Sequence, residues 1–179
     1  MADTELWVFG YGSLIWEPGF GFDERRLARL QGFHRSFCMR SVHHRGTPER
    51  PGLVLALDES PRQACDGVAY RVQAGQAEAT LDYLRERELV SSAYLETRQR
   101  VGLRGGGAVE AVTFVVDRSH VQYCGALSLE EQAEIIAGAT GGRGPNPEYL
   151  WNTAAHLAEL GIADADLAWL ARRVRALAG

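Results

Sequence analysis

The chain has 179 residues, of which 46% are hydrophobic and 23% charged, and its formal net charge is -4. This length predicts a single domain over residues 1–179 with a substantial core, and the composition excludes a disordered chain. The negative charge argues against nucleic-acid partners, so we expect a small-molecule substrate. No basic, apolar leader opens the sequence, and no apolar run approaches the roughly 18 residues of a membrane span. The sequence therefore predicts a cytoplasmic protein with no membrane partner, and it specifies no oligomeric state.

The segment WVFGYGSLIW at residues 7–16 is the first informative motif. In it a short apolar strand leads into Gly10, Tyr11, Gly12 and Ser13. Glycines on both sides of Tyr11 let another molecule approach the main chain closely. N–H groups exposed in such a turn form a concavity that suits a carboxylate or a developing oxyanion. We predict a cradle of this kind, and the alternative is a structural corner packed with aromatic side chains.

Spacing excludes two other functions for this turn. A dinucleotide-binding motif needs a third glycine where Ile15 stands, followed by a helix that Pro18 would interrupt. A nucleophile elbow needs a glycine where Tyr11 stands. Ser13 is therefore predicted to bind the substrate and not to attack it.

The segments after this motif are predicted from their composition. Residues 22–30 carry too many charges for a strand and are expected to form a short helix or turn. Three segments rich in apolar, aromatic or sulfur side chains are predicted strands, namely residues 32–40, 52–57 and 67–72. A polar loop over residues 41–51 joins the first two.

Neither the histidines nor the cysteines indicate a metal site. His43 and His44 are adjacent, so in an extended segment they point to opposite sides, and no nearby residue completes a zinc pattern. Cys38, Cys65 and Cys124 are odd in number and widely spaced, which argues against disulfides and against a thiolate site. We interpret the cysteines as small buried hydrophobic residues.

Residues 76–89 have helical periodicity. Ala77, Leu81, Leu84 and Glu88 are spaced by four, three and four residues, which places all four on one face of a helix. Glu88 thus occupies a position where an apolar residue is expected. This carboxylate is the most informative anomaly in the sequence.

Two interpretations of Glu88 stay open at this point. An exposed glutamate in the last helical turn could pair with Arg85, which is common and contributes little stability. A buried glutamate near a helix C-terminus would instead have a raised pKa and would serve as a general base.

The C-terminal half is predicted to contain a hairpin and three helices. Strands at residues 94–103 and 109–116 are expected to join across three glycines. A capping box that begins at Ser128 opens a helix to about Ala137, and the glycine-rich loop after it lacks the lysine of a phosphate-binding loop.

Two further helices follow this loop. Asn146 is expected to cap a helix with Pro147 at its first position and Gly161 just past its end. Asp164 can cap the last helix, whose predicted buried face consists of Leu167, Leu170, Val174 and Leu177.

Six segments of the chain form a combination that is more specific than any one of them. They are VFGYGSLIW at 8–16, HRGTPERPG at 44–52, GVAYRV at 67–72, YLRERE at 83–88, YCGALSLEEQAEII at 123–136 and GPNPEYL at 144–150. In this order they resemble the ChaC family of glutathione-specific γ-glutamylcyclotransferases, over nearly the whole chain. The resemblance implies an α+β fold, with a small mixed, partly closed β-barrel and flanking helices.

The resemblance also implies which residues form the site. The catalytic glutamate of the family, at the end of the helix before the hairpin, falls on Glu88, in agreement with the helical spacing. The γ-glutamyl-binding motif falls on Val8, Phe9, Gly10, Tyr11, Gly12, Ser13 and Leu14. The chain departs from some relatives at His43, where they carry an acidic residue, and this departure bears on the fine substrate preference.

The implied reaction cleaves glutathione into 5-oxoproline and cysteinylglycine by attack of the substrate's own α-amine, with Glu88 as general acid and base. It requires no metal and no organic cofactor. One alternative is a cyclotransferase for other γ-glutamyl compounds. An alternative of a different class is a non-catalytic ligand-binding or transport-regulating module, in which Glu88 is only a surface residue.

Overall fold

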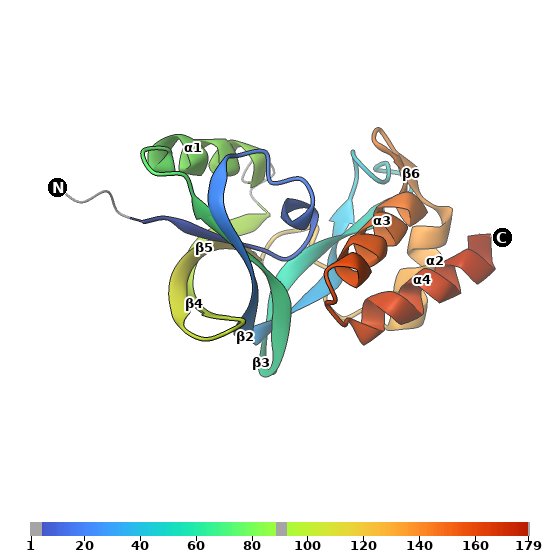
Figure 1. Ribbon diagram of the computed structural model, residues 1–179. Helices are drawn as coiled ribbons and strands as arrows, with labels where there is room; N and C mark the ends of the chain where they lie inside the picture. Colours follow the sequence, from blue (N-terminus) through green and yellow to red (C-terminus); the bar gives the residue numbers. More distant parts are fainter. Residues whose placement is uncertain (1–4, 89–92, 179) are drawn as a thin grey trace. The chain divides into compact units, whose positions relative to one another are not determined.

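The computed structural model describes residues 5–88 and 93–178 (Figure 1). Strands and helices both contribute, which confirms the predicted α+β class. The elements in chain order are β1 (Trp7–Gly10), η1 (Ser13–Ile15), β2 (Phe22–Ser41), β3 (Gly52–Val72), α1 (Ala77–Glu88), β4 (Tyr94–Leu103), β5 (Ala108–Val116), α2 (Leu129–Gly138), β6 (Thr140–Gly141), β7 (Gly144–Pro145), α3 (Asn146–Glu159) and α4 (Ala165–Ala178), where η1 is a short 3₁₀ helix.

Five strands form a closed barrel in the order β1-β3-β2-β4-β5. Strand β1 pairs antiparallel with β3, where Phe9 lies opposite Ala69, and parallel with β5, where Trp7 lies opposite Ala111. The parallel pair between β1 and β5 makes the barrel mixed, so the predicted mixed barrel is confirmed. The wall is continuous through β5 back to β1, so the barrel is closed, whereas the family resemblance implied partial closure.

The chain divides into two compact units, which are described separately. The first comprises Met1–Arg35 and Leu57–His120, and the second comprises Ser36–Ala56 and Val121–Gly179. Strands β2 and β3 contribute residues to both units. The prediction of one domain over the whole chain stays a prediction.

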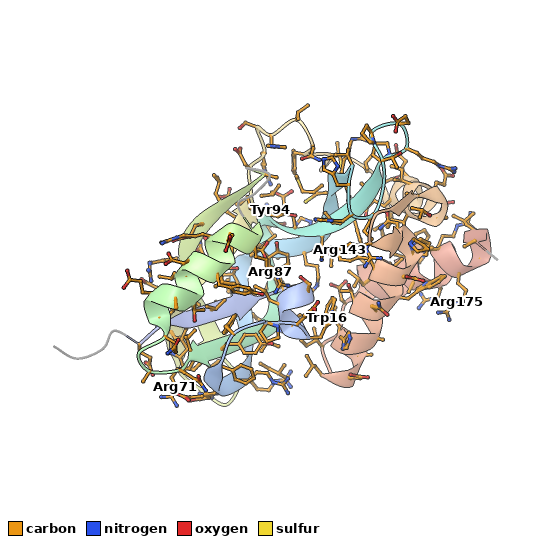
Figure 2. All side chains as sticks on the ribbon, turned by 90° about the horizontal axis from the view of Figure 1, so that it is seen from above. Trp16, Arg71, Arg87, Tyr94, Arg143 and Arg175 are labelled. Carbon is orange, nitrogen blue, oxygen red and sulfur yellow. The ribbon has the colours of Figure 1, made fainter. Side chains whose placement is uncertain are left out.

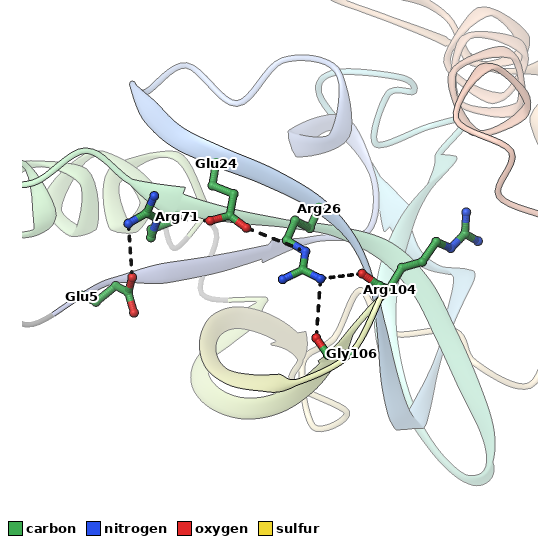
Figure 3. A network of polar contacts seen from close by, with 6 residues as sticks. All are labelled: Glu5, Glu24, Arg26, Arg71, Arg104 and Gly106. Carbon is green, nitrogen blue, oxygen red and sulfur yellow. Dashed lines mark hydrogen bonds and ion pairs between the residues drawn. The ribbon is translucent and has the colours of Figure 1, made fainter.

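The helix or turn predicted at residues 22–30 is wrong, because this segment is the first half of β2. Its residues Ala28 and Leu30 are buried, while several of its charged side chains form polar contacts, such as the ion pair of Arg29 with Asp66 at 2.7 Å. Arg26 donates a hydrogen bond of 2.6 Å to the carbonyl oxygen of Arg104 and lies 3.7 Å from the carboxylate of Glu24 (Figure 3). These partners stabilise the strand. Its many charged residues obscure the alternation of apolar and polar residues by which a strand is recognised.

The predicted strands at residues 52–57 and 67–72 are parts of one long strand, β3. The stretch that joins them is mostly exposed and includes Pro61. An exposed, proline-containing stretch carries no alternation of apolar and polar residues, so the pattern concealed its strand conformation.

The predicted helix over residues 76–89 and the hairpin after it are confirmed as α1 and the pair β4 and β5. Helix α1 ends at Glu88, and Leu89, the predicted last residue, lies outside the described residues. Leu84 is fully buried and belongs to one core cluster with Val8, Leu14 and Phe114, so this face of the helix packs on the barrel strands. Strands β4 and β5 pair antiparallel along their length, and the three glycines between them all have positive φ.

In the second unit α2 and α3 pack against α4. The capping box of α2 is confirmed, because Ser128 accepts a hydrogen bond from the N–H of Glu131 and the Glu131 side chain accepts one in return. None of the described helices has both the length and the apolar character needed to cross a membrane.

The predicted helix cap at Asn146 is wrong. Pro145 occupies the cap position, and Asn146 is the first residue of α3. Its buried amide accepts a hydrogen bond from the N–H of Leu53 at 2.8 Å and donates one to the carbonyl oxygen of Leu53 at 2.9 Å. The Asn146 side chain therefore joins α3 to a strand residue, and no side-chain hydrogen bond caps the start of this helix.

The end of α3 and the start of α4 confirm the sequence pattern. Gly161 follows α3 with a φ of 72°, and Asp164 accepts a hydrogen bond of 3.0 Å from the N–H of Leu167. Most of the predicted apolar face of α4 is buried, but Leu177, in the last helical turn, is 40% exposed.

Candidate active site

The turn after β1 is held by hydrogen bonds from within and from the barrel. The N–H of Ile15 donates to the carbonyl oxygen of Gly12 at 2.9 Å, and this bond defines the short helix η1. The hydroxyl of Tyr70 on β3 lies 2.8 Å from the carbonyl oxygens of both Leu14 and Ile15, so its single proton is shared between them. Burial raises the pKa of Tyr70 to about 12, against the opposing effect of Arg25. The phenol is therefore neutral at physiological pH and serves as a donor to the turn.

Three predicted site residues have buried side chains. Val8 and Phe9 are fully buried, and Leu14 is nearly so. The carbonyl oxygen of Phe9 accepts a hydrogen bond of 3.1 Å from the hydroxyl of Thr113 on β5. These side chains position the backbone of the turn. Because they are buried, a substrate would contact these three residues through their main-chain atoms.

The two glycines of the turn have different surroundings. A Cβ atom added at Gly10 would lie 2.9 Å from Cβ of Leu14, so the neighbouring residue leaves no room for a side chain. Gly12 is buried, yet a Cβ atom there would meet no described atom beyond its chain neighbours within 4 Å. Open space over a buried glycine provides room for a group that approaches the main chain closely.

Arg35 on β2 holds the middle of the turn. Its guanidinium donates hydrogen bonds of 2.6 Å to the carbonyl oxygen of Tyr11 and of 2.7 Å to that of Asp66. Both Arg35 and Tyr11 are buried. Sequence analysis missed Arg35, although a signal was present: a charged residue stands between Phe33 and Phe37 at the spacing of one strand face.

Glu88 is the last residue of α1 and is mostly buried, with 18% of its side chain exposed. Burial raises its pKa above the ordinary value for glutamate, and the nearby charge of Arg87 partly opposes this shift. The alternative pairing with Arg85 does not occur, because Arg85 makes an ion pair of 2.6 Å with Glu96 on β4. Of the two interpretations left open by the sequence, the structure favours the mostly buried glutamate with a raised pKa.

Arg87 contacts both the glutamate and the turn, and sequence analysis missed it. Its Nε lies 3.6 Å from the Glu88 carboxylate, and its Nη2 donates a hydrogen bond of 2.9 Å to the hydroxyl of Ser13. Ser13 therefore accepts a hydrogen bond in the structure, in keeping with a residue that does not act as nucleophile. Through Arg87 the structure brings Glu88 and the glycine turn together.

The histidines and cysteines can be compared with the prediction that they form no metal site. Burial and the charges of Arg143, His43 and Arg45 lower the pKa of His44. Across residues 5–88 and 93–178, no three His, Cys, Asp or Glu side chains are grouped so that they could hold a metal. All three cysteines are free, and two of them are buried as predicted, whereas Cys124 is half-buried.

Comparison with known proteins identifies relatives over most of the chain. The sequence model of the ChaC-like protein family matches residues 6–177. The glutathione-specific γ-glutamylcyclotransferase of Escherichia coli is 39% identical over 159 residues, which are 89% of this chain and 68% of that protein. γ-Glutamylcyclotransferase 2-3 of Arabidopsis thaliana is 35% identical over 176 residues, which are 95% of this chain and 88% of that protein.

A solved structure agrees with these relatives. The crystal structure of a γ-glutamyl cyclotransferase specific to glutathione from yeast matches with a TM-score of 0.85 and 26% identity, and the match covers 96% of each chain. The resemblance inferred from the six sequence segments is thus confirmed by a family match and by a shared fold. The chain belongs to the ChaC family.

Proposed function

We propose that this protein is a γ-glutamylcyclotransferase that cleaves glutathione into 5-oxoproline and cysteinylglycine. The names of the E. coli and yeast relatives support glutathione as the substrate. The observation in this chain that carries the proposal is Glu88, a buried carboxylate with a raised pKa that Arg87 connects to the glycine turn.

The reaction forms one bond and breaks one. The α-amino nitrogen of the γ-glutamyl group attacks its own γ-carbonyl carbon, and the five-membered ring of 5-oxoproline closes. The amide bond to the cysteine nitrogen then breaks, and cysteinylglycine leaves. No water is consumed, because the two products together have the composition of glutathione. The nucleophile is intramolecular, so correct folding of the substrate supplies several kcal/mol of the barrier reduction, about 7 or more in the best-oriented cases.

Glu88 moves the proton in this proposal. As a carboxylate it accepts a proton from the substrate ammonium group, which makes the amine nucleophilic, and it later delivers a proton to the leaving nitrogen. A pKa raised by burial brings the carboxyl group closer to the operating pH, which favours both transfers.

The segment Val8–Leu14 binds the γ-glutamyl group in this proposal, with Gly10, Tyr11, Gly12 and Ser13 as its turn. The open space over buried Gly12 is the observation that supports it. Main-chain N–H groups of the turn stabilise the substrate carboxylate or the oxyanion that forms on the γ-carbonyl oxygen. The buried side chains of Val8, Phe9 and Leu14 hold this backbone in place.

The reaction as proposed uses no metal and no organic cofactor, because the substrate supplies the nucleophile and Glu88 supplies the proton transfer. A cytoplasmic location also stays part of the proposal.

A product assay tests the proposed function. The protein is incubated with glutathione, and separately with γ-glutamyl amino acids, and 5-oxoproline is measured by mass spectrometry. We expect release of 5-oxoproline and cysteinylglycine in equal amounts from glutathione, and much slower turnover of the other compounds. Faster turnover of γ-glutamyl amino acids than of glutathione would show that these compounds, and not glutathione, are the preferred substrates. Binding of glutathione without product would identify a non-catalytic ligand-binding module.

A further inference from the structure

The guanidinium of Arg87 contacts five groups of the first unit. Nη2 donates to the hydroxyl of Ser13 at 2.9 Å, and Nη1 donates to the carbonyl oxygen of Glu17 at 2.7 Å and to that of Pro18 at 3.4 Å. Nη1 also donates to the hydroxyl of Tyr83, one helical turn earlier, at 3.1 Å. Nε lies 3.6 Å from the carboxylate of Glu88.

These contacts divide between two parts of the first unit. Ser13, Glu17 and Pro18 belong to the segment that leads out of the glycine turn, whereas Tyr83 and Glu88 belong to α1. The planar fork of an arginine can bond to several groups at once in a fixed geometry. Figure 2 labels both Arg87, on α1, and Trp16, which lies within the segment Ser13–Pro18.

We propose that Arg87 is a positioning residue for the reaction, whose guanidinium fixes the end of α1 that carries Glu88 against the segment Ser13–Pro18. The inference rests on the proposed function, in which Glu88 is the base and the glycine turn holds the γ-glutamyl group. A shift of about 1 Å between base and substrate can cost about 100-fold in rate, so a rigid link between them is a requirement of the chemistry.

A role as an ordinary surface charge fits Arg87 less well than it fits Arg85. The Arg85 side chain is 46% exposed, and its partners are the carboxylates of Glu96 and Asp82. The Arg87 side chain is 21% exposed and bonds mainly to carbonyl and hydroxyl oxygens of the turn segment. The two arginines lie on one helix, so Arg85 provides a matched control.

Arg87 also sets the charge environment of Glu88. In the part of the chain that the structure describes, Arg87 is the charged group that acts on Glu88. The turn presents the neutral Ser13 hydroxyl and the carbonyl oxygen of Glu17 to the same guanidinium, whereas the Glu96 carboxylate on β4 is paired with Arg85. Removal of the Arg87 charge therefore raises the pKa of Glu88 further, because burial then acts without opposition.

Three variants distinguish the positioning role of Arg87 from the effect of its charge on Glu88. Arg87→Lys keeps the charge but replaces the planar fork by a single ammonium group, so kcat should fall at least about tenfold while the acidic limb of the pH profile of kcat stays in place. Arg87→Gln removes the charge as well, so kcat should fall and the acidic limb should move to higher pH. Arg85→Gln should leave kcat within about twofold and the limb unchanged, because exposed ion pairs contribute little.

The experiment measures kcat and KM from 5-oxoproline release between pH 5 and 9, with thermal melting as the folding control. A folded Arg87→Lys variant with the wild-type kcat would overturn the inference, as would a folded Arg87→Gln variant with an unmoved acidic limb. If Arg87→Gln does not fold, the kcat of Arg87→Lys decides alone. Glu88→Gln is measured in parallel: if it is inactive while the Arg87 variants are normal, only this inference fails, and if it is active, the proposed function of Glu88 fails.

Discussion

The guanidinium of Arg87 donates a hydrogen bond of 2.9 Å to the hydroxyl oxygen of Ser13, across 74 residues of sequence. The bond joins the end of α1 to the turn that follows β1. Tyr70 and Arg35 hold the same turn from β3 and β2, through the carbonyl oxygens of Leu14, Ile15 and Tyr11. The turn and the helix end thus form one fixed assembly on the barrel, with the buried Glu88 carboxylate beside it.

The raised pKa of Glu88 predicts that this residue costs stability at neutral pH. The folded-state pKa exceeds the unfolded value, so the contribution of Glu88 is most favourable in acid and is lost as the pH rises through the interval between the two values. Glu88→Gln should therefore be more stable than the wild type at pH 7.5, and this difference should disappear in acid, below the ordinary pKa of glutamate. Urea unfolding at a series of pH values measures the effect. A difference in unfolding free energy that does not change with pH would contradict the assigned shift.

Gly12 and Gly10 predict opposite consequences for a side chain in the turn. At Gly12 there is open space, so Gly12→Val should fold but should raise KM at least about tenfold, because the side chain fills the volume proposed for the γ-glutamyl group. At Gly10 the added Cβ atom meets Leu14, so Gly10→Ala should lower stability by about 1–3 kcal/mol through overpacking. Thermal melting and steady-state kinetics are measured for both. A folded Gly12→Val variant with normal KM would show that the substrate lies elsewhere.

Tyr70→Phe tests the support of the turn from the barrel. The variant removes the hydroxyl that lies against the carbonyl oxygens of Leu14 and Ile15, and both oxygens lose a buried donor. We expect a loss of about 1–3 kcal/mol in unfolding free energy, as for other buried groups left unsatisfied. Urea denaturation measures this loss. A change smaller than about 0.5 kcal/mol, the range of ordinary surface substitutions, would mean that water or another donor replaces the phenol.

The alternation and periodicity of the sequence predicted the elements whose apolar residues face one core. Helix α1, the β4–β5 hairpin and the caps at Ser128 and Asp164 are of this kind. The first half of β2, residues 22–30, was missed because its charged residues find partners that are distant in sequence, as Arg26 does with the carbonyl oxygen of Arg104 just after β4. The role of Asn146 was missed because its partner, Leu53, is 93 residues away, and no local pattern indicates such a contact.

In the candidate site, too, some residues were predictable from the sequence and others were not. Glu88 was predictable because a carboxylate interrupts an apolar helix face, and the glycine turn because its residue types are unusual together. Arg87 carries no such signal, because an arginine in the last turn of a helix is ordinary. Its function depends on contacts with Ser13 and Glu17, which only the fold brings to it.

Because the substrate supplies its own nucleophile, we predict that turnover depends neither on a metal ion nor on a cysteine thiol of the protein. Activity should persist in excess chelator, and each single Cys→Ala variant at Cys38, Cys65 and Cys124 should retain turnover, although the buried sites should lose some stability. Assays of 5-oxoproline with and without chelator, together with mass spectrometry of the protein during turnover, check both points. Loss of activity that a divalent ion restores, or a covalent intermediate on the protein, would contradict the mechanism.

The turnover of Glu88→Gln tests the central claim most directly. Glutamine keeps the size of the side chain but cannot accept the proton, so glutathione should still bind while kcat for 5-oxoproline release falls by about 10²–10⁴-fold. Thermal melting must show that the variant is folded, and isothermal titration measures the binding of glutathione. A folded Glu88→Gln variant that binds glutathione and releases 5-oxoproline at a rate near that of the wild type would contradict the assignment of Glu88 as the base.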